Sequence, residues 1–108
     1  MIHYPNLLDS HAALERLNRD EAILVDVRER GEIARAAFDA PHVVHMPLSE
    51  FERRHTELPH DREIILACAT GNRSFQAMHY LAHRGWPKVA NLQGGISIWH
   101  AHGLPVKT

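Results

Sequence analysis

The chain has 108 residues, of which 44% are hydrophobic and 23% charged, with a formal net charge of −1 at pH 7. This length suits one domain with its own core, the one cysteine excludes an intramolecular disulfide, and the scattered Lys and Arg lack the pattern of a nucleic-acid-binding protein. Without a secretory signal pattern or an apolar run long enough to cross a bilayer, we expect a cytoplasmic protein whose partners are neither nucleic acid nor membrane.

Helix and strand patterns alternate through the first half of the chain. Asp9 or Ser10 can cap the first helix, and Leu7 is expected on its apolar side. Ser49 with Glu52 forms a capping-box pattern for a later short helix. The elements expected in this half are a helix from about 10 to 18, a buried strand at 23–27, a helix at 29–37 ending before Pro41, a strand at 43–46 and a helix at 49–54.

The same alternation continues in the second half. A strand at 63–67 has the most apolar sequence, and a helix at 72–84 follows, with Gly85 placed to terminate it. A strand at 89–92 and a helix at 95–101 complete the pattern. Alternating strands and helices predict an α/β fold whose mostly parallel sheet is covered on both faces and binds ligands at the carboxyl ends of its strands.

Cys68 is expected at one of these strand ends, in a loop that passes directly into a helix. Amides at a helix start lack intrahelical partners, and the helix dipole adds partial positive charge there. Gly71 allows successive amides to turn toward one point, and Arg73 adds a full charge. These features stabilise an anion and lower the pKa of a thiol, so the sequence predicts a reactive thiolate rather than an inert buried cysteine.

The motifs around this loop resemble those of the single-domain rhodanese family. They are Cys-x-x-Gly-x-Arg-Ser at 68–74, Asp-Val-Arg-Glu at 26–29, Leu-Gln-Gly-Gly at 92–95 and Trp99. The resemblance implies that residues 1–108 form a single rhodanese-like domain, a three-layer α/β/α fold with a central mostly parallel sheet. It also implies a sulfurtransferase that takes sulfane sulfur from a small donor, thiosulfate or a persulfide, and passes it to a thiol, a protein or cyanide.

In this interpretation Cys68 is the catalytic nucleophile and carries the sulfur as a persulfide. Asp26 and Arg28 support the site from a neighbouring strand end, or form only a structural ion pair. No cofactor is expected. No metal is expected either, because His79 and His83 stand one helical turn apart without a third ligand at suitable spacing. The residues expected to bind substrate are Ala69, Thr70, Gly71, Asn72, Arg73 and Ser74.

Two alternatives remain open on the sequence. Related phosphatases and arsenate reductases of this fold have one more residue between cysteine and arginine, whereas four residues separate Cys68 from Arg73 here. A non-catalytic interaction module is the other alternative, although such modules usually lack the cysteine or the arginine. The segment 38–43 departs from the family pattern, and Ala69 and Thr70 provide no charge for the sulfonate of thiosulfate, which leaves the donor open.

Overall fold

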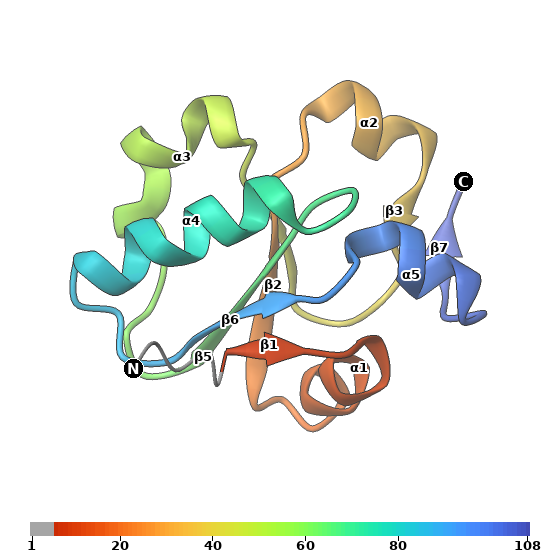
Figure 1. The fold of residues 1–108 in the computed structure, drawn as a ribbon, viewed down its shortest axis with the longest axis horizontal. Coiled ribbons are helices and arrows are strands. Elements are labelled where there is room, and N and C mark those ends of the chain that lie inside the picture. The colour runs from red at the N-terminus through yellow and green to blue at the C-terminus, as the bar shows by residue number, and fades with distance from the viewer. Residues whose placement is uncertain (1–5) are drawn as a thin grey trace.

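A parallel sheet of five strands forms the centre of the computed structural model, which describes residues 6–108 (Figure 1). The strands lie in the spatial order β1 (Leu7–Leu8), β6 (Val89–Leu92), β5 (Glu63–Ala67), β2 (Ala22–Asp26) and β4 (Val43–His45). Each pairing is parallel, and β5 occupies the middle of the sheet. Cys68, which follows β5, therefore lies at the centre of the sheet edge where α/β proteins bind ligands.

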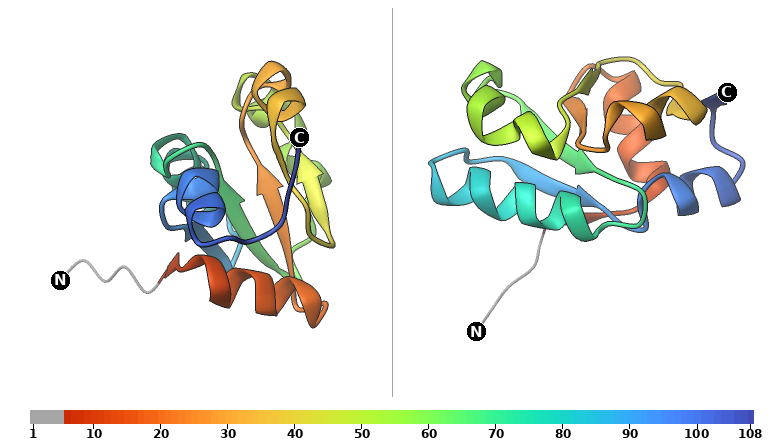
Figure 2. Two further views of the ribbon diagram at one scale, coloured as in Figure 1. Left: turned by 90° about the vertical axis from the view of Figure 1, so that its right-hand side faces the viewer. Right: turned by 90° about the horizontal axis from the view of Figure 1, so that it is seen from above.

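Helices cover both faces of this sheet (Figure 1; Figure 2). Helices α3 (Leu48–Arg54) and α4 (Asn72–His83) pack on one face, and α1 (Ser10–Asn18) and α5 (Gly95–Ala101) pack on the other. Helix α2 (Arg30–Arg35) follows the carboxyl end of β2 and buries none of its residues. The expected three-layer α/β/α fold with a mostly parallel central sheet is confirmed.

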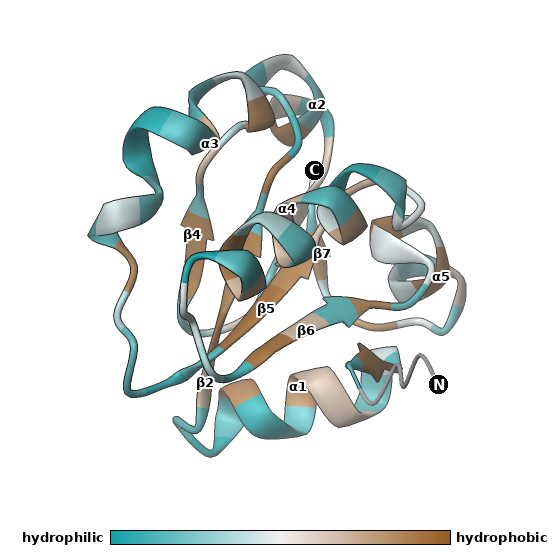
Figure 3. Cartoon of the chain, turned by 60° about the vertical axis from the view of Figure 1, so that its left-hand side comes forward, coloured by the Kyte–Doolittle hydropathy of each residue, from teal (hydrophilic) through white to brown (hydrophobic). Residues whose placement is uncertain are grey.

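Strand β5 is apolar on both of its faces because each face lies under a helical layer. Ile64 and Leu66 belong to the core cluster beneath α3 and α4, whereas Ile65 and Ala67 belong to the cluster beneath α1 and α5. This alternation is the two-residue period of a strand. Figure 3 shows the result as hydrophobic strands inside helices whose outer sides are largely hydrophilic. Trp99 is fully buried in the second cluster, as expected for a core residue.

Three short strands were not predicted. Strand β1 contains Leu7, so the prediction that Leu7 lies on the apolar side of the first helix is wrong, and the residue is 49% exposed. Strands β3 (Ala37–Phe38) and β7 (Val106–Lys107) form a separate antiparallel pair. This pairing ends α2 earlier than the sequence pattern indicated. Two-residue strands are set by partners distant in the chain, so they leave little periodic signal.

The capping box predicted at Ser49 is also wrong. Helix α3 begins at Leu48, and the Ser49 amide and hydroxyl donate to the Glu29 carboxylate at 3.2 and 2.8 Å. The capping box lies instead at the start of α2, between Glu29 and Glu32. After α3 the chain forms a single 3-10 turn, His55–Glu57. Among residues 6–108, no helix is both long and apolar enough to span a bilayer.

Candidate active site

The Cys68 sulfur lies in a cradle formed by the first residues of α4. The residue is 1% exposed, and its Sγ accepts hydrogen bonds from the amides of Gly71 at 3.1 Å and Ser74 at 3.4 Å. Gly71 is the N-cap of α4 and has a φ of +110°, in the left-handed region that favours glycine. This backbone turn directs the amides toward the sulfur, as the sequence predicted.

The environment of Cys68 favours a thiolate. Burial acts to raise the pKa of the thiol, but hydrogen bonds from the Ser74 hydroxyl and from the amides of Ser74, Gly71 and Thr70 act in the opposite direction. Together they hold the pKa of Cys68 below its ordinary value. Hydrogen bonds to the charged form are the physical cause, since an amide donates to a thiolate more strongly than to a neutral thiol.

Ser74 and Asn91 connect the cradle to strand β6. The Ser74 hydroxyl lies 3.2 Å from the Cys68 sulfur and donates to the Asn91 side-chain oxygen at 2.5 Å. The Asn91 amide nitrogen donates to the Gly71 carbonyl at 3.1 Å. Ser74 is fully buried and Asn91 is 3% exposed. Sequence reasoning missed Asn91, although a polar residue inside an otherwise apolar strand was the available signal.

The start of α5 fixes the other side of the cysteine loop (Figure 2). The Ile96 amide donates to the Cys68 carbonyl at 3.0 Å, and the Ser97 amide donates to the Ala69 carbonyl at 3.1 Å. Gly95 allows this approach, because a Cβ atom there would lie 2.3 Å from the Cys68 carbonyl oxygen. The first amides of this helix therefore bind the loop backbone, which explains Gly95. Gly94 has a different reason, because a Cβ atom there would lie 2.1 Å from the Ile98 side chain.

The positive charge of Arg73 is shared between the Cys68 cradle and the carboxylate of Glu32 on α2. Its guanidinium makes two hydrogen bonds of 2.8 Å to the Glu32 carboxylate, and both side chains are about one-third exposed. This pair lowers the pKa of Glu32 to about 2 and raises that of Arg73. The Cys68 thiolate also contributes to the raised pKa of Arg73, so the two charges still interact. Glu32 was not predicted as part of the site.

Asp26 and Arg28 form a buried ion pair at the end of β2. Arg28 Nη2 lies 2.8 Å from Asp26 Oδ2, and the two side chains are 4% and 0% exposed. Arg28 also donates to the Ala36 carbonyl at 2.9 Å and lies over the ring of Phe38. The pair therefore joins β2 to the segment after α2. This matches the structural ion pair that was one of the two interpretations from the sequence.

The remaining predicted residues line the outside of the loop. Thr70 and Asn72 are exposed, and Ala69 is partly exposed with its carbonyl bonded to α5. On α4, the rings of His79 and His83 lie 6.5 Å apart. Within residues 6–108, no group of three or more His, Cys, Asp or Glu side chains is placed to hold a metal ion.

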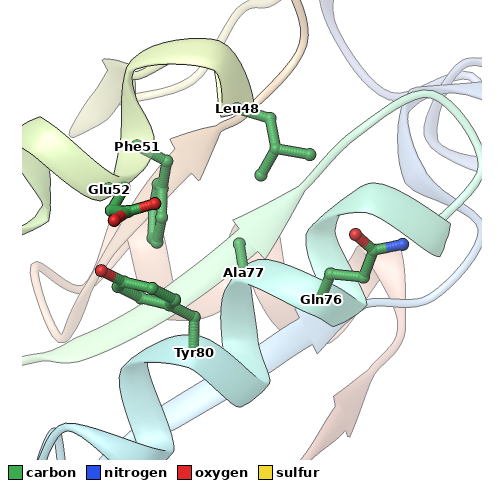
Figure 4. A pocket seen from close by; sticks show the side chains of 6 residues that line it. All are labelled: Leu48, Phe51, Glu52, Gln76, Ala77 and Tyr80. Carbon is green, nitrogen blue, oxygen red and sulfur yellow. The ribbon is translucent and has the colours of Figure 1, made fainter.

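A separate hollow of about 180 Å³ lies between α3 and α4 (Figure 4). Its walls are mainly apolar, and three of the lining side chains also carry polar atoms. None of the predicted site residues lines it. The lining residues are Leu48, Phe51, Glu52, Gln76, Ala77 and Tyr80.

Comparison with known proteins identifies the family to which a chain with this fold and cysteine loop is similar. A family model described as the rhodanese-like domain matches residues 9–102. A sulfurtransferase of Allochromatium vinosum is 38% identical over 102 residues, which cover 94% of each chain. A thiosulfate sulfurtransferase of Vibrio cholerae is 28% identical over 101 residues, which cover 93% of this chain and 92% of the relative.

Solved structures give the same result. A rhodanese-related protein of Thermoplasma volcanium superposes with a TM-score of 0.85 at 26% identity, covering 94% of this chain and 97% of its own. The family match and the relatives named sulfurtransferases support sulfur transfer in general as the activity. On its fold, its cysteine loop and these matches, the chain belongs to the rhodanese-like domain family.

Proposed function

We propose that the protein transfers sulfane sulfur from a small donor to a thiol, a protein or cyanide through a persulfide on Cys68. The observation that carries this proposal is the pair of amides, of Gly71 and Ser74, directed at a sulfur whose pKa is lowered. This environment prepares a thiolate without a separate general base.

The proposed reaction has two displacements at sulfur. The Cys68 thiolate attacks the outer sulfur of the donor, a new S–S bond forms, and the donor S–S bond breaks with its electron pair leaving on sulfite or on a thiolate. The acceptor then attacks the outer sulfur of the persulfide, and the electron pair of that bond returns to Cys68. With cyanide the product is thiocyanate. The amides that stabilise the initial thiolate also stabilise the thiolate released in the second step.

The charges around the loop favour a persulfide donor over thiosulfate. Thiosulfate is a dianion, and its sulfonate needs positive charge. Arg28, Arg30 and Arg73 lie at this end of the sheet, and each is paired with a carboxylate, from Asp26, Glu50 and Glu32 respectively. The pairing leaves little net positive charge there for a sulfonate bonded directly to the transferred sulfur, a group that alkyl persulfides lack. We therefore propose that persulfides load Cys68 faster than thiosulfate does.

Intact-protein mass spectrometry tests this function directly. The reduced chain is incubated with glutathione persulfide or with thiosulfate, beside Cys68→Ala as the matched control. We expect an added sulfur of about 32 Da on the unsubstituted chain alone, with faster loading from the persulfide. Subsequent cyanide should remove the added mass and form thiocyanate.

The same experiment can also contradict the proposal. If neither donor adds sulfur to Cys68, the sulfur-transfer proposal fails. Hydrolysis of an aryl phosphate or turnover of arsenate by the same preparation would then favour the oxyanion chemistry of related enzymes. Inactivity in all three assays would favour an interaction module.

A further inference from the structure

The Ser74 hydroxyl has one proton and two neighbours that compete for it. Its oxygen lies 2.5 Å from the Asn91 side-chain oxygen and 3.2 Å from the Cys68 sulfur. A hydroxyl donates only one hydrogen bond. Ser74, Asn91 and Cys68 are all buried, so bulk water does not supply a second donor to either neighbour.

The orientation of Asn91 follows from its other hydrogen bond. Its amide nitrogen donates to the Gly71 carbonyl, which can only accept. The side-chain oxygen therefore faces Ser74, and the short contact between the two oxygens requires the Ser74 proton to point at Asn91. In this arrangement the lone pairs of the Ser74 oxygen face the Cys68 sulfur.

This orientation of the Ser74 proton suits a neutral Cys68 sulfur, whereas the backbone amides and a Ser74 proton turned toward the sulfur favour the thiolate. A thiol can donate its proton to the Ser74 oxygen, but a thiolate has no proton and meets the oxygen lone pairs. Ser74 stabilises the thiolate only after its proton has turned from Asn91 to the sulfur. The two backbone amides, in contrast, donate to the sulfur in either state.

We propose that Asn91 is a positioning residue that holds the Ser74 proton while the Cys68 sulfur is uncharged and gives it up when the sulfur becomes a thiolate. Only a rotation about the Ser74 side chain is required, and no proton is gained or lost by Ser74. In the proposed sulfur transfer, the proton points at Cys68 before attack on the donor. It returns to Asn91 in the persulfide and turns to Cys68 again when the acceptor removes the outer sulfur.

Other charges near Cys68 are unchanged by a substitution of Asn91, because they come from other elements. Helix α4 contributes a cation, α2 and its N-cap residue contribute one carboxylate each, and β2 with the residues after it contributes a buried ion pair. The groups are Arg73, Glu29, Glu32, Asp26 and Arg28. A changed titration of Cys68 in an Asn91 variant is therefore assigned to the hydrogen-bond network.

The test is a thiolate titration of Cys68, followed by ultraviolet absorbance, in a double-mutant cycle. Cys68 is the only cysteine, so subtraction of Cys68→Ser leaves its signal alone. We expect Asn91→Leu to free the Ser74 proton and increase the thiolate fraction about tenfold at a pH below the midpoint, the effect of one hydrogen bond to a charged group. Ser74→Ala should decrease that fraction. Added to Ser74→Ala, the substitution Asn91→Leu should change nothing further.

Three outcomes would overturn the proposal. Asn91→Leu could leave the titration unchanged, raise its midpoint, or shift it equally with and without Ser74. An equal shift would mean that Asn91 acts through the Gly71 carbonyl and the shape of the loop. Circular dichroism checks the fold of each variant, and Asn91→Ala replaces Asn91→Leu if the latter does not fold. The inference rests on the proposed function only for its place in the reaction cycle, and the titration needs no sulfur donor, so either can fail alone.

Discussion

Substitution of Gly95 by alanine should destabilise the protein by loosening α5 from the cysteine loop. The added Cβ would lie 2.3 Å from the Cys68 carbonyl oxygen and 2.6 Å from the Ala69 carbonyl carbon and oxygen, all of them backbone atoms. The helix start must move away, which breaks the hydrogen bonds from Ile96 and Ser97 to these carbonyls. Two such bonds contribute about 1 kcal/mol each, and a left-handed alanine costs about 1–2 kcal/mol.

The free energy of unfolding should therefore fall by about 3–4 kcal/mol, a large part of the total for a domain of this size. Urea denaturation measures the loss. Gly103→Ala is the matched control, because Gly103 also has a positive φ, of +76°, but a Cβ there meets no atom within 4 Å. It should lose only the conformational part, about 1–2 kcal/mol. Equal losses in the two variants would refute the argument that α5 holds the loop through this close approach.

Three further predictions concern ion pairs. Glu32→Gln should release the charge of Arg73 and raise kcat/KM for thiosulfate relative to a persulfide, measured with both donors; an unchanged ratio would contradict the donor argument. Because Arg73 lowers the pKa of Glu32 from 4.5 to about 2, the pair stabilises the fold above pH 4.5 and loses this effect as the pH falls toward 2. The stability difference between the parent chain and Glu32→Gln, under about 1 kcal/mol for a partly exposed pair, should disappear over that range in urea titrations. Asp26→Asn should lower the free energy of unfolding by about 3–5 kcal/mol, because it leaves buried Arg28 without its counter-charge. Glu15→Gln, in an exposed pair, is its control and should change stability by less than about 1 kcal/mol; similar losses would contradict the burial argument.

The long elements of the fold could be predicted because their signals are local. The apolar run at 63–67 and the amphipathic pattern after Asn72 give β5 and α4 nearly residue for residue. The strands at 37–38 and 106–107 could not be predicted, since each exists only through its pairing with the other. The misplaced capping box has a similar cause, because Ser49 bonds to Glu29, twenty residues away, rather than within its own helix.

The residues of the candidate site also fall into two groups, those whose place follows from local sequence and those brought in by packing between distant elements. Cys68, Gly71 and Ser74 are close in sequence, and one strand-loop-helix turn brings them together, so their placement was predictable. Glu32 and Asn91 reach the site from α2 and β6, and their contribution depends on packing between elements. Arg73 illustrates the limit, since its position was predicted but its bidentate partner was not.

The loop around Cys68 is built from segments that are far apart in the chain, and this makes its chemistry a property of the folded state. The Ile96 and Ser97 amides hold its backbone, and Asn91 holds Gly71, so residues twenty or more positions downstream complete the cradle. In the unfolded chain these donors are dispersed in water, and Cys68 has the ordinary pKa of a cysteine in a peptide. A denatured molecule therefore loses the hydrogen bonds that lower the pKa of Cys68 together with its fold, so the thiolate fraction at a fixed pH falls as the protein unfolds.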